Sequence, residues 1–204
     1  MTLESLAALM LASFLAKAIP GPGVFATVAH ALVLGFRPSL VFVAGIMTGD
    51  SIYILAAMFG MVALANSFHD IFNLIRIIGG VYLLYLGYRL LTTRIEQSET
   101  PEIHPKNTQR TYLSGFFLTL GNPKTILFYI GLMPAFIDLG ALEGSEMALL
   151  WLLLNIDLLL ILGAYAYASD RARGFFKSPR AMQRLNRGAG LALAGTGVAV
   201  IART

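Results

Sequence analysis

Cysteine is absent from this chain of 204 residues, and charged residues make up only 13% of it. The first absence excludes disulfide bonds, thiolate metal sites and thiol relays, because each of these needs a cysteine sulfur. The low charge excludes an ordinary water-soluble domain, whose outer surface needs many more charged side chains. Apolar residues are abundant instead: they reach 57%, and the mean hydropathy of +0.73 is typical of a membrane protein.

Six apolar runs are long enough to cross a hydrocarbon core, which takes about 17–25 residues each. They lie at about 3–35, 38–65, 71–91, 111–137, 147–168 and 187–202. A polar stretch with two prolines separates the third run from the fourth. We therefore predict an all-α integral membrane protein with six transmembrane helices, divided into a first three-helix repeat at 1–91, a cytoplasmic linker at 92–110 and a second three-helix repeat at 111–204.

Lysine and arginine are unevenly distributed over the predicted loops. The first, third and fifth loops hold most of the 15 basic residues, whereas the opposite side holds Arg76 and Arg203. Short basic loops stay in the cytoplasm, so we expect both termini on the periplasmic side of the inner membrane. The net charge of +4 then reflects topology and not a nucleic-acid site. The first run lacks a positively charged start, so we do not expect it to be a cleaved signal peptide.

Proline and glycine interrupt the first and the fourth run. The first contains PGPG at 20–23 and the fourth contains GNPK at 121–124. Proline lacks the amide hydrogen, and the residue before it avoids the helical region, so each run should break into two half-helices. The freed backbone groups cannot face lipid and must be buried in protein or line a wet cavity.

Each break also offers a place for a ligand. A half-helix that starts at Pro22 or Pro123 presents free amide groups to an anion such as a carboxylate, and Asn122 suits the N-cap of the second one. A simple proline kink is the alternative for one break, but two breaks at matching positions favour a site. The residues that we predict to bind the substrate are Pro20, Gly21, Pro22, Gly23, Asn122, Pro123 and Lys124.

Four ionisable residues lie deep inside apolar runs. At about 1.5 Å per residue, Asp50 and Asp157 come roughly 18 and 15 Å into their runs, near the middle of a core about 30 Å thick. Lys17 and Lys124 are also too deep to reach the membrane surface easily. Such charges should face the bundle interior, where either lysine could neutralise an aspartate. We predict that Asp50, Asp157 and Lys17 couple transport to a proton or another ion; a purely structural ion pair is the alternative.

Features of the first half recur in the same order in the second half. They are the breaks at Pro22 and Pro123, the aspartates Asp50 and Asp157, and the glycine pairs Gly80/Gly87 and Gly190/Gly197. With three spans in each half, the halves enter the membrane from opposite sides, so this similarity indicates an inverted repeat. A small-residue packing seam is the alternative explanation for the glycine pairs.

The predicted cavity offers amide groups for a carboxylate and acidic groups for an ammonium, which suits an amino acid. A cation, a dipeptide or another small polar solute would also fit it. An intramembrane enzyme would need a nucleophile or a metal, but the sequence has no cysteine, no clustered histidines and no serine with a histidine at comparable depth, so we predict no catalytic residue, metal or cofactor. We expect His30, near the inner end of the first run, to be solvated. A membrane scaffold would leave the breaks and the buried aspartates unexplained.

Several stretches match one family. They are PGPGVFATVAHALVLGFRPSL at 20–40, GIMTGD at 45–50, GGVYLLYLGYRLL at 79–91 and GFFLTLGNPKTILFY at 115–129. With these stretches the chain resembles the bacterial LysE/RhtB amino-acid exporters, typified by the lysine exporter and the homoserine/threonine exporters. The resemblance implies an inner-membrane exporter of amino acids that is driven by the proton gradient and forms a homodimer. The matching site positions are Pro20, Gly21, Pro22, Asp50, Asn122, Pro123 and Lys124.

Two positions depart from the pattern of this family. Members often carry asparagine where this chain has Gly23, and Lys17 is atypical. The chain therefore lacks a polar side chain beside the first break and has an additional cation near it, and both differences bear on the identity of the substrate.

Overall fold

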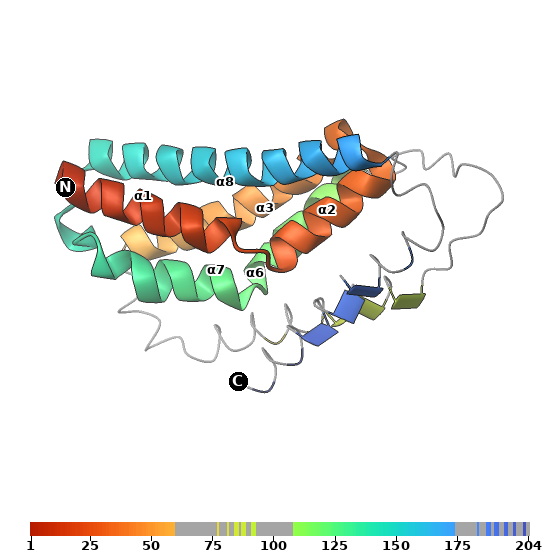
Figure 1. Ribbon diagram of the computed structural model, residues 1–204. Coiled ribbons are helices and arrows are strands. Elements are labelled where there is room, and N and C mark those ends of the chain that lie inside the picture. Colours follow the sequence, from red (N-terminus) through yellow and green to blue (C-terminus); the bar gives the residue numbers. More distant parts are fainter. Residues whose placement is uncertain are drawn as a thin grey trace.

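The computed structural model describes residues 1–59 and 108–173, together with single residues between 77 and 92 and between 183 and 202. Every element of regular structure in these described residues is a helix (Figure 1), so the predicted all-α fold is confirmed. Residues 60–65 of the second predicted run, most of the third and sixth runs and most of the linker at 92–110 lie outside the described residues.

The first predicted run consists of two helices, α1 (Leu3–Ala18) and α2 (Pro22–Leu34), bent against each other by 56°. α1 ends before Pro20, because the residue ahead of a proline avoids helical backbone angles. Pro22 takes the first position of α2, where its missing amide breaks no helical hydrogen bond. α2 ends at Gly35, whose φ of 94° lies in the left-handed region that favours glycine.

The fourth predicted run is broken in the same way, with a bend of 55° between its two parts. The parts are α6 (Thr108–Leu120), followed by α7 (Pro123–Ile126), the π-helical turn η1 (Leu127–Leu132) and the 3-10 turn η2 (Met133–Ala135). The side-chain oxygen of Asn122 accepts a hydrogen bond from the backbone nitrogen of Lys124 at 3.1 Å. The predicted breaks and the Asn122 cap are therefore confirmed.

The second and fifth predicted runs contain unbroken helices, α3 (Phe36–Met58) and α8 (Gly144–Ala172). A short 3-10 turn, η3 (Leu139–Ala141), precedes α8, which begins with a capping box between Glu143 and Glu146. Among the described residues, α3 and α8 are each long and apolar enough to cross a membrane, and each bent pair passes the same test as one span. The described residues thus hold up to four candidate spans, and a total of six stays a prediction.

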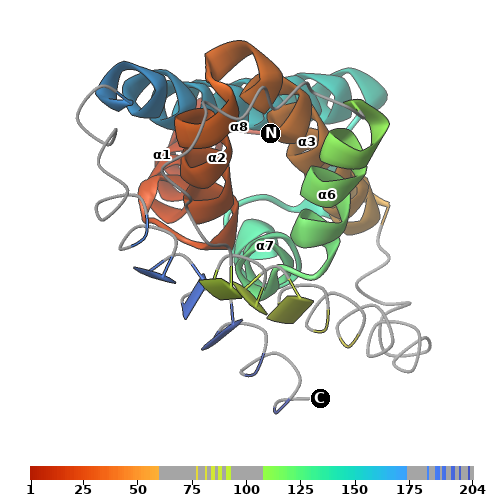
Figure 2. The same cartoon turned by 90° about the vertical axis from the view of Figure 1, so that its right-hand side faces the viewer.

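These helices form one elongated bundle, in which α8 runs along both α1 and α2 (Figure 1). Seen from one end, α1 and α2 lie on one side and α3 and α6 on the other, with α8 and α7 between them above and below (Figure 2). The C-terminal end of α8 is tied to the end of α2, since Arg173 donates from Nε to the Leu32 carbonyl at 3.1 Å and from Nη2 to the Val33 carbonyl at 3.0 Å.

α3 and α6 pack with their backbones in contact. A Cβ atom on Gly45 would lie 2.0 Å from the carbonyl oxygen of Tyr112, and one on Gly115 would lie 2.1 Å from that of Phe42. Small residues allow such close approach between membrane helices, where lipid provides no hydrophobic drive for association. The glycines of GIMTGD, at 45–50, therefore bring α3 against α6 and hold Asp50 at a fixed depth in the bundle.

Replacing Gly45 with alanine is therefore expected to force α3 and α6 apart and to lower the free energy of unfolding by about 1–3 kcal/mol. Gly163→Ala in α8 is the matched control, because nothing lies within 4 Å of a Cβ at that position. Thermal unfolding of both variants in detergent tests this. Equal melting temperatures for Gly45→Ala and wild type would contradict the tight α3–α6 contact.

The glycines of the third and sixth predicted spans also approach each other. A Cβ on Gly87 would lie 2.7 Å from the carbonyl oxygen of Gly190, and one on Gly190 would lie 2.9 Å from that of Gly87. The packing seam that the sequence offered as an alternative therefore exists at this pair. Their partners Gly80 and Gly197 lie outside the described residues.

Two clusters of buried apolar side chains make up the described core. One includes Leu9, Tyr53, Tyr129, Leu150 and Leu154, and the other includes Val24, Phe42, Ile46, Leu158 and Leu162. α3 and α8 contribute to both clusters, so these two helices run from one to the other. The breaks between α1 and α2 and between α6 and α7 are where residues of both clusters meet around one cavity.

Candidate functional site

A cavity lies between the two helix breaks. Its empty space, with the open mouth included, amounts to about 550 Å³. Four of the seven predicted substrate residues line it, together with both Lys17 and Asp50: they are Gly21, Gly23, Asn122 and Lys124. Pro20, Pro22 and Pro123 shape the breaks from which these residues project. Residues from both halves of the chain thus surround one space.

Lys17 bridges the two buried aspartates. Its Nζ lies 3.5 Å from Oδ2 of Asp157 and 4.0 Å from Oδ2 of Asp50, and it donates a hydrogen bond to the Leu154 carbonyl at 3.0 Å. Only 3% of Asp50 and 7% of Asp157 is exposed, so this pairing takes place away from bulk solvent. In such surroundings each charge depends on its neighbours, because a lone buried ion is very costly.

Each carboxylate also accepts a hydrogen bond from a hydroxyl group. The Tyr129 hydroxyl donates to Oδ2 of Asp50 at 2.5 Å, and the Ser13 hydroxyl donates to Oδ2 of Asp157 at 2.6 Å. Lys17 Nζ lies 5.8 and 6.0 Å from the ring centroids of Tyr129 and Phe128, within the range of cation–π attraction. Two carboxylates, a carbonyl and two aromatic rings therefore surround one ammonium group.

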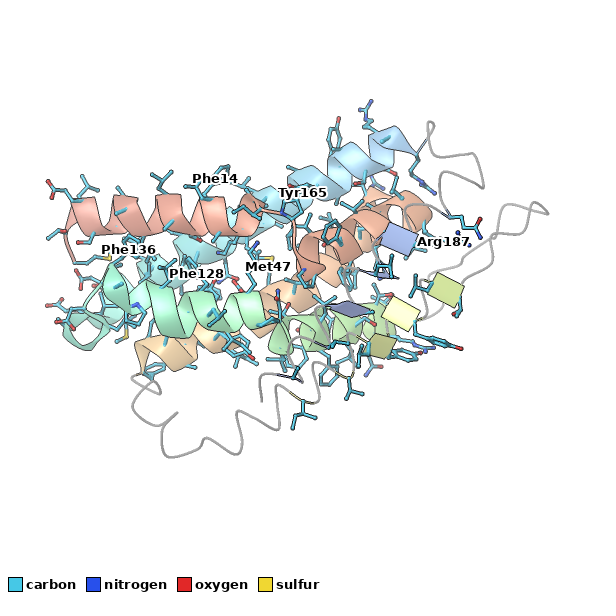
Figure 3. All side chains as sticks on the ribbon, turned by 60° about the horizontal axis from the view of Figure 1, so that its bottom comes forward. Phe14, Met47, Phe128, Phe136, Tyr165 and Arg187 are labelled. Atoms are coloured by element: carbon cyan, nitrogen blue, oxygen red, sulfur yellow. The ribbon has the colours of Figure 1, made fainter. Side chains whose placement is uncertain are left out.

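Side chains satisfy backbone carbonyls that the breaks leave free. At the first break, the Tyr165 hydroxyl donates to the Ala18 carbonyl at 2.9 Å, and Tyr165 lies beside the end of α1 (Figure 3). Lys124 Nζ donates to the Ile19 carbonyl at 2.5 Å. At the second break, the Tyr53 hydroxyl donates to the Leu120 carbonyl at 2.5 Å. Each half of the chain thus supplies hydrogen-bond donors to the free carbonyls at the break in the other half. Such partners are needed because the interior of a membrane offers no water to these groups.

The two cavity lysines have different partners. The sequence allowed either lysine to neutralise an aspartate, but in the described residues only Lys17 forms such ion pairs. Lys124 reaches the first break instead, where a Cβ on Gly21 would lie 3.6 Å from its Nζ. Of the two lysines, Lys17 is therefore the one that pairs with the aspartates, whereas the helix that carries Lys124 aims it at the free end of α1.

The expectation of a solvated His30 is also wrong. Its ring stacks on Phe42 with 4.3 Å between the centroids, and its Nδ1 is buried without a hydrogen-bond partner. The reason is the turn at Gly35, which folds α3 back against α2. Sequence reasoning also missed Tyr129 and Ser13 as hydrogen-bond donors to Asp50 and Asp157. Each donor lies far along the chain from its aspartate and meets it only because the helices pack together.

Comparison with known proteins decides the family. A family model described as "LysE type translocator" matches residues 14–204. The chain belongs to this family. The predicted LysE/RhtB relationship is thereby confirmed, and this LysE type translocator is a membrane transport protein. No solved structure matches the chain.

Relatives with modest identity cover most of this translocator. An uncharacterized membrane protein of Synechocystis is 26% identical over 187 residues, which is 92% of this chain and 90% of the relative. A homoserine/homoserine lactone efflux protein of Salmonella typhi is 26% identical over 93% of this chain and 92% of the relative. A leucine efflux protein of Klebsiella pneumoniae is 32% identical over 60% of this chain and 58% of the relative.

Proposed function

We propose that this translocator exports amino acids, or close derivatives of them, across the bacterial inner membrane by proton antiport. The observation that carries the proposal is the cavity between two helix breaks, with two buried carboxylates bridged by the ammonium of Lys17. The names of the leucine and homoserine efflux proteins support amino acids as the substrate class and export as the direction.

The cavity offers complementary groups to both charged ends of an amino acid. The substrate ammonium would take the position of Lys17 Nζ, where Asp50 and Asp157 provide negative charge. The substrate carboxylate would lie at the first turn of α2, whose amides have no partner within the helix, and near Lys124. In this proposal Pro20, Pro22 and Pro123 keep the helices open, Asn122 caps the second break, and Gly21 and Gly23 let the substrate approach the backbone.

Coupling follows if protons and substrate compete for the same carboxylates. In a state open to the periplasm, protonation of Asp50 or Asp157 would remove the charge that holds the substrate ammonium and so release the substrate. In a state open to the cytoplasm, loss of the proton would restore the charge and the next substrate would bind. Lys17 would hold the carboxylates together between these events. The inward proton gradient then drives outward transport of the amino acid.

Counterflow in proteoliposomes tests the proposed function. Vesicles loaded with one unlabelled amino acid at a time are assayed for uptake of the same labelled amino acid, and a pH gradient is then imposed across the membrane. We expect exchange with at least one amino acid and net transport against the direction of proton flow. Folded protein that exchanges none of the amino acids would contradict the substrate class, and exchange that is indifferent to the gradient would contradict proton antiport.

We further propose that the two halves are inverted repeats of three spans, with both termini on the periplasmic side, in a homodimer. The similar bends of 56° and 55° at matching positions support the repeat. A tyrosine of each half, Tyr53 or Tyr165, donates a hydrogen bond to a free carbonyl at the break in the other half, and this symmetry also supports the repeat. Transport would then proceed by rocking of one half against the other around the cavity.

Fixing the two halves to each other is expected to stop exchange. Ser51 on α3 and Asn155 on α8 belong to different halves, and Ser51 Oγ lies 3.2 Å from Asn155 Oδ1. Because the chain has no cysteine, Ser51→Cys/Asn155→Cys would form a single disulfide. We expect counterflow to fall at least tenfold on oxidation and to return with reductant. Each single cysteine variant is the control, and full exchange by the oxidised pair would contradict rocking between the halves.

A further inference from the structure

Part of the cavity wall is apolar. Val24 of α2, Ile46 of α3, and Leu158 and Leu162 of α8 line the cavity and also pack within one core cluster. Phe128 also lines the cavity and adds an aromatic surface whose ring centroid is 6.0 Å from Lys17 Nζ, and it lies toward the middle of the bundle (Figure 3). These side chains have no hydrogen-bonding group, so a polar substituent placed against them would lose its partners in water.

The charges at the cavity balance. In the described residues, the charged side chains that line it or form an ion pair with a lining residue are two lysines, Lys17 and Lys124, and two aspartates, Asp50 and Asp157. An amino acid with a neutral side chain adds one positive and one negative group, so the balance is kept. A cationic or anionic side chain would add one buried charge without a partner, at a cost of several kcal/mol.

Gly23 leaves room beside the apolar wall. A Cβ at this position would meet only Ile46 Cδ1, at 3.8 Å, which is an ordinary van der Waals distance. Gly23 itself lines the cavity, so a larger side chain there would fit the backbone and occupy space within the cavity. At Gly21, by contrast, a Cβ would already lie 3.4 Å from Lys124 Cδ. Gly23 is therefore the position at which the chain can change the size of the cavity with least disturbance.

We infer that the cavity selects amino acids with a neutral, branched aliphatic side chain, which packs against Val24, Ile46, Leu158 and Leu162, and that Gly23 determines the largest side chain accepted. This inference rests on the proposed export of amino acids and narrows its substrate class. The charge balance disfavours positive and negative side chains, and polar ones bind less well against these four side chains, which have no hydrogen-bonding group.

Counterflow with a panel of amino acids tests the selectivity. The panel contains leucine, isoleucine, valine, alanine, lysine and glutamate. We expect the wild type to exchange leucine, isoleucine and valine at least tenfold faster than lysine and glutamate. Lysine or glutamate exchange as fast as leucine exchange would overturn the inference while the proposed export function stands. If folded protein exchanges no amino acid, the proposed function fails and this inference fails with it.

Gly23→Val tests the role of Gly23. One methylene group in an apolar pocket changes discrimination by about 10–200-fold, and valine adds three carbon atoms, so we expect leucine exchange to fall at least tenfold relative to alanine exchange. Gly163→Val is the matched control, because a Cβ there meets nothing within 4 Å and Gly163 does not line the cavity. An unchanged ratio of leucine to alanine exchange in Gly23→Val would overturn the role of Gly23.

A second pair of variants covers the case in which Gly23→Val fails to fold. Gly23→Ala adds only the Cβ and is expected to reduce leucine exchange relative to alanine exchange in the same direction by a smaller factor. Ile46→Ala enlarges the same wall and is expected to increase phenylalanine exchange relative to leucine exchange at least threefold. If both variants unfold like the wild type and neither the ratio of leucine to alanine exchange nor the ratio of phenylalanine to leucine exchange changes, this wall does not contact the substrate side chain and the inference is overturned.

Discussion

Asp50→Asn is expected to reduce amino-acid exchange in proteoliposomes by about 100-fold while the protein stays folded. A buried charge pair that loses one partner loses about 2–5 kcal/mol of binding, which corresponds to about 30-fold to several thousand-fold in affinity. Asparagine has the shape of aspartate, and its side-chain oxygen can still accept the hydrogen bond from Tyr129 that now reaches Asp50 Oδ2. The substitution therefore removes charge and keeps the packing.

A matched control separates this effect from a general effect of the substitution. Asp138→Asn makes the same change at an exposed residue that caps η3, where asparagine also serves as a cap. We expect Asp138→Asn to exchange like the wild type, and Asp157→Asn to lose exchange as Asp50→Asn does. Wild-type exchange by folded Asp50→Asn would remove this residue from both substrate binding and proton coupling.

The helix breaks could be predicted from the sequence because their causes are local. Pro22 removes an amide group wherever it stands in a helix, and Asn122 caps a helix with its own side chain. The burial of Asp50 and Asp157 followed from their depth in long apolar runs, which depends only on the rise per residue. These features needed no knowledge of which helix packs against which.

The partners of these residues depend on the packing of distant helices and could not be predicted in that way. Nothing near Tyr129 in the sequence shows that it reaches Asp50, and Ser13 is one hydroxyl among several in the apolar runs. The signal for Tyr129 was weak: a polar group in a buried stretch just after the second break. Which of the two lysines pairs with the aspartates likewise depends on helix packing. α1 lies beside α8, and this brings Lys17 to the Leu154 carbonyl.

Lys17→Gln is expected to lower the stability of the protein by about 3–5 kcal/mol and to abolish exchange. Lys17 is the only cation paired with Asp50 or Asp157 in the described residues, and both carboxylates are buried. Without it, each carboxylate keeps a single hydroxyl donor, Tyr129 or Ser13, and the two negative charges face each other in a medium that screens them poorly. Thermal unfolding in detergent measures the loss.

The double variant Lys17→Gln/Asp157→Asn distinguishes lost charge compensation from lost packing. It removes one positive and one negative charge, so the net charge at the cavity returns to that of the wild type. We expect it to recover most of the stability lost in Lys17→Gln but no exchange, because the substrate ammonium would face one carboxylate only. Lys124→Gln is the matched control: glutamine can still donate to the Ile19 carbonyl, and the loss should stay near or below about 1.5 kcal/mol. If Lys17→Gln unfolds like the wild type, Lys17 does not stabilise the pair of carboxylates. If the double variant is less stable than Lys17→Gln, Lys17 stabilises the protein through its packing and not through its charge. Either result contradicts the coupling role proposed for Lys17.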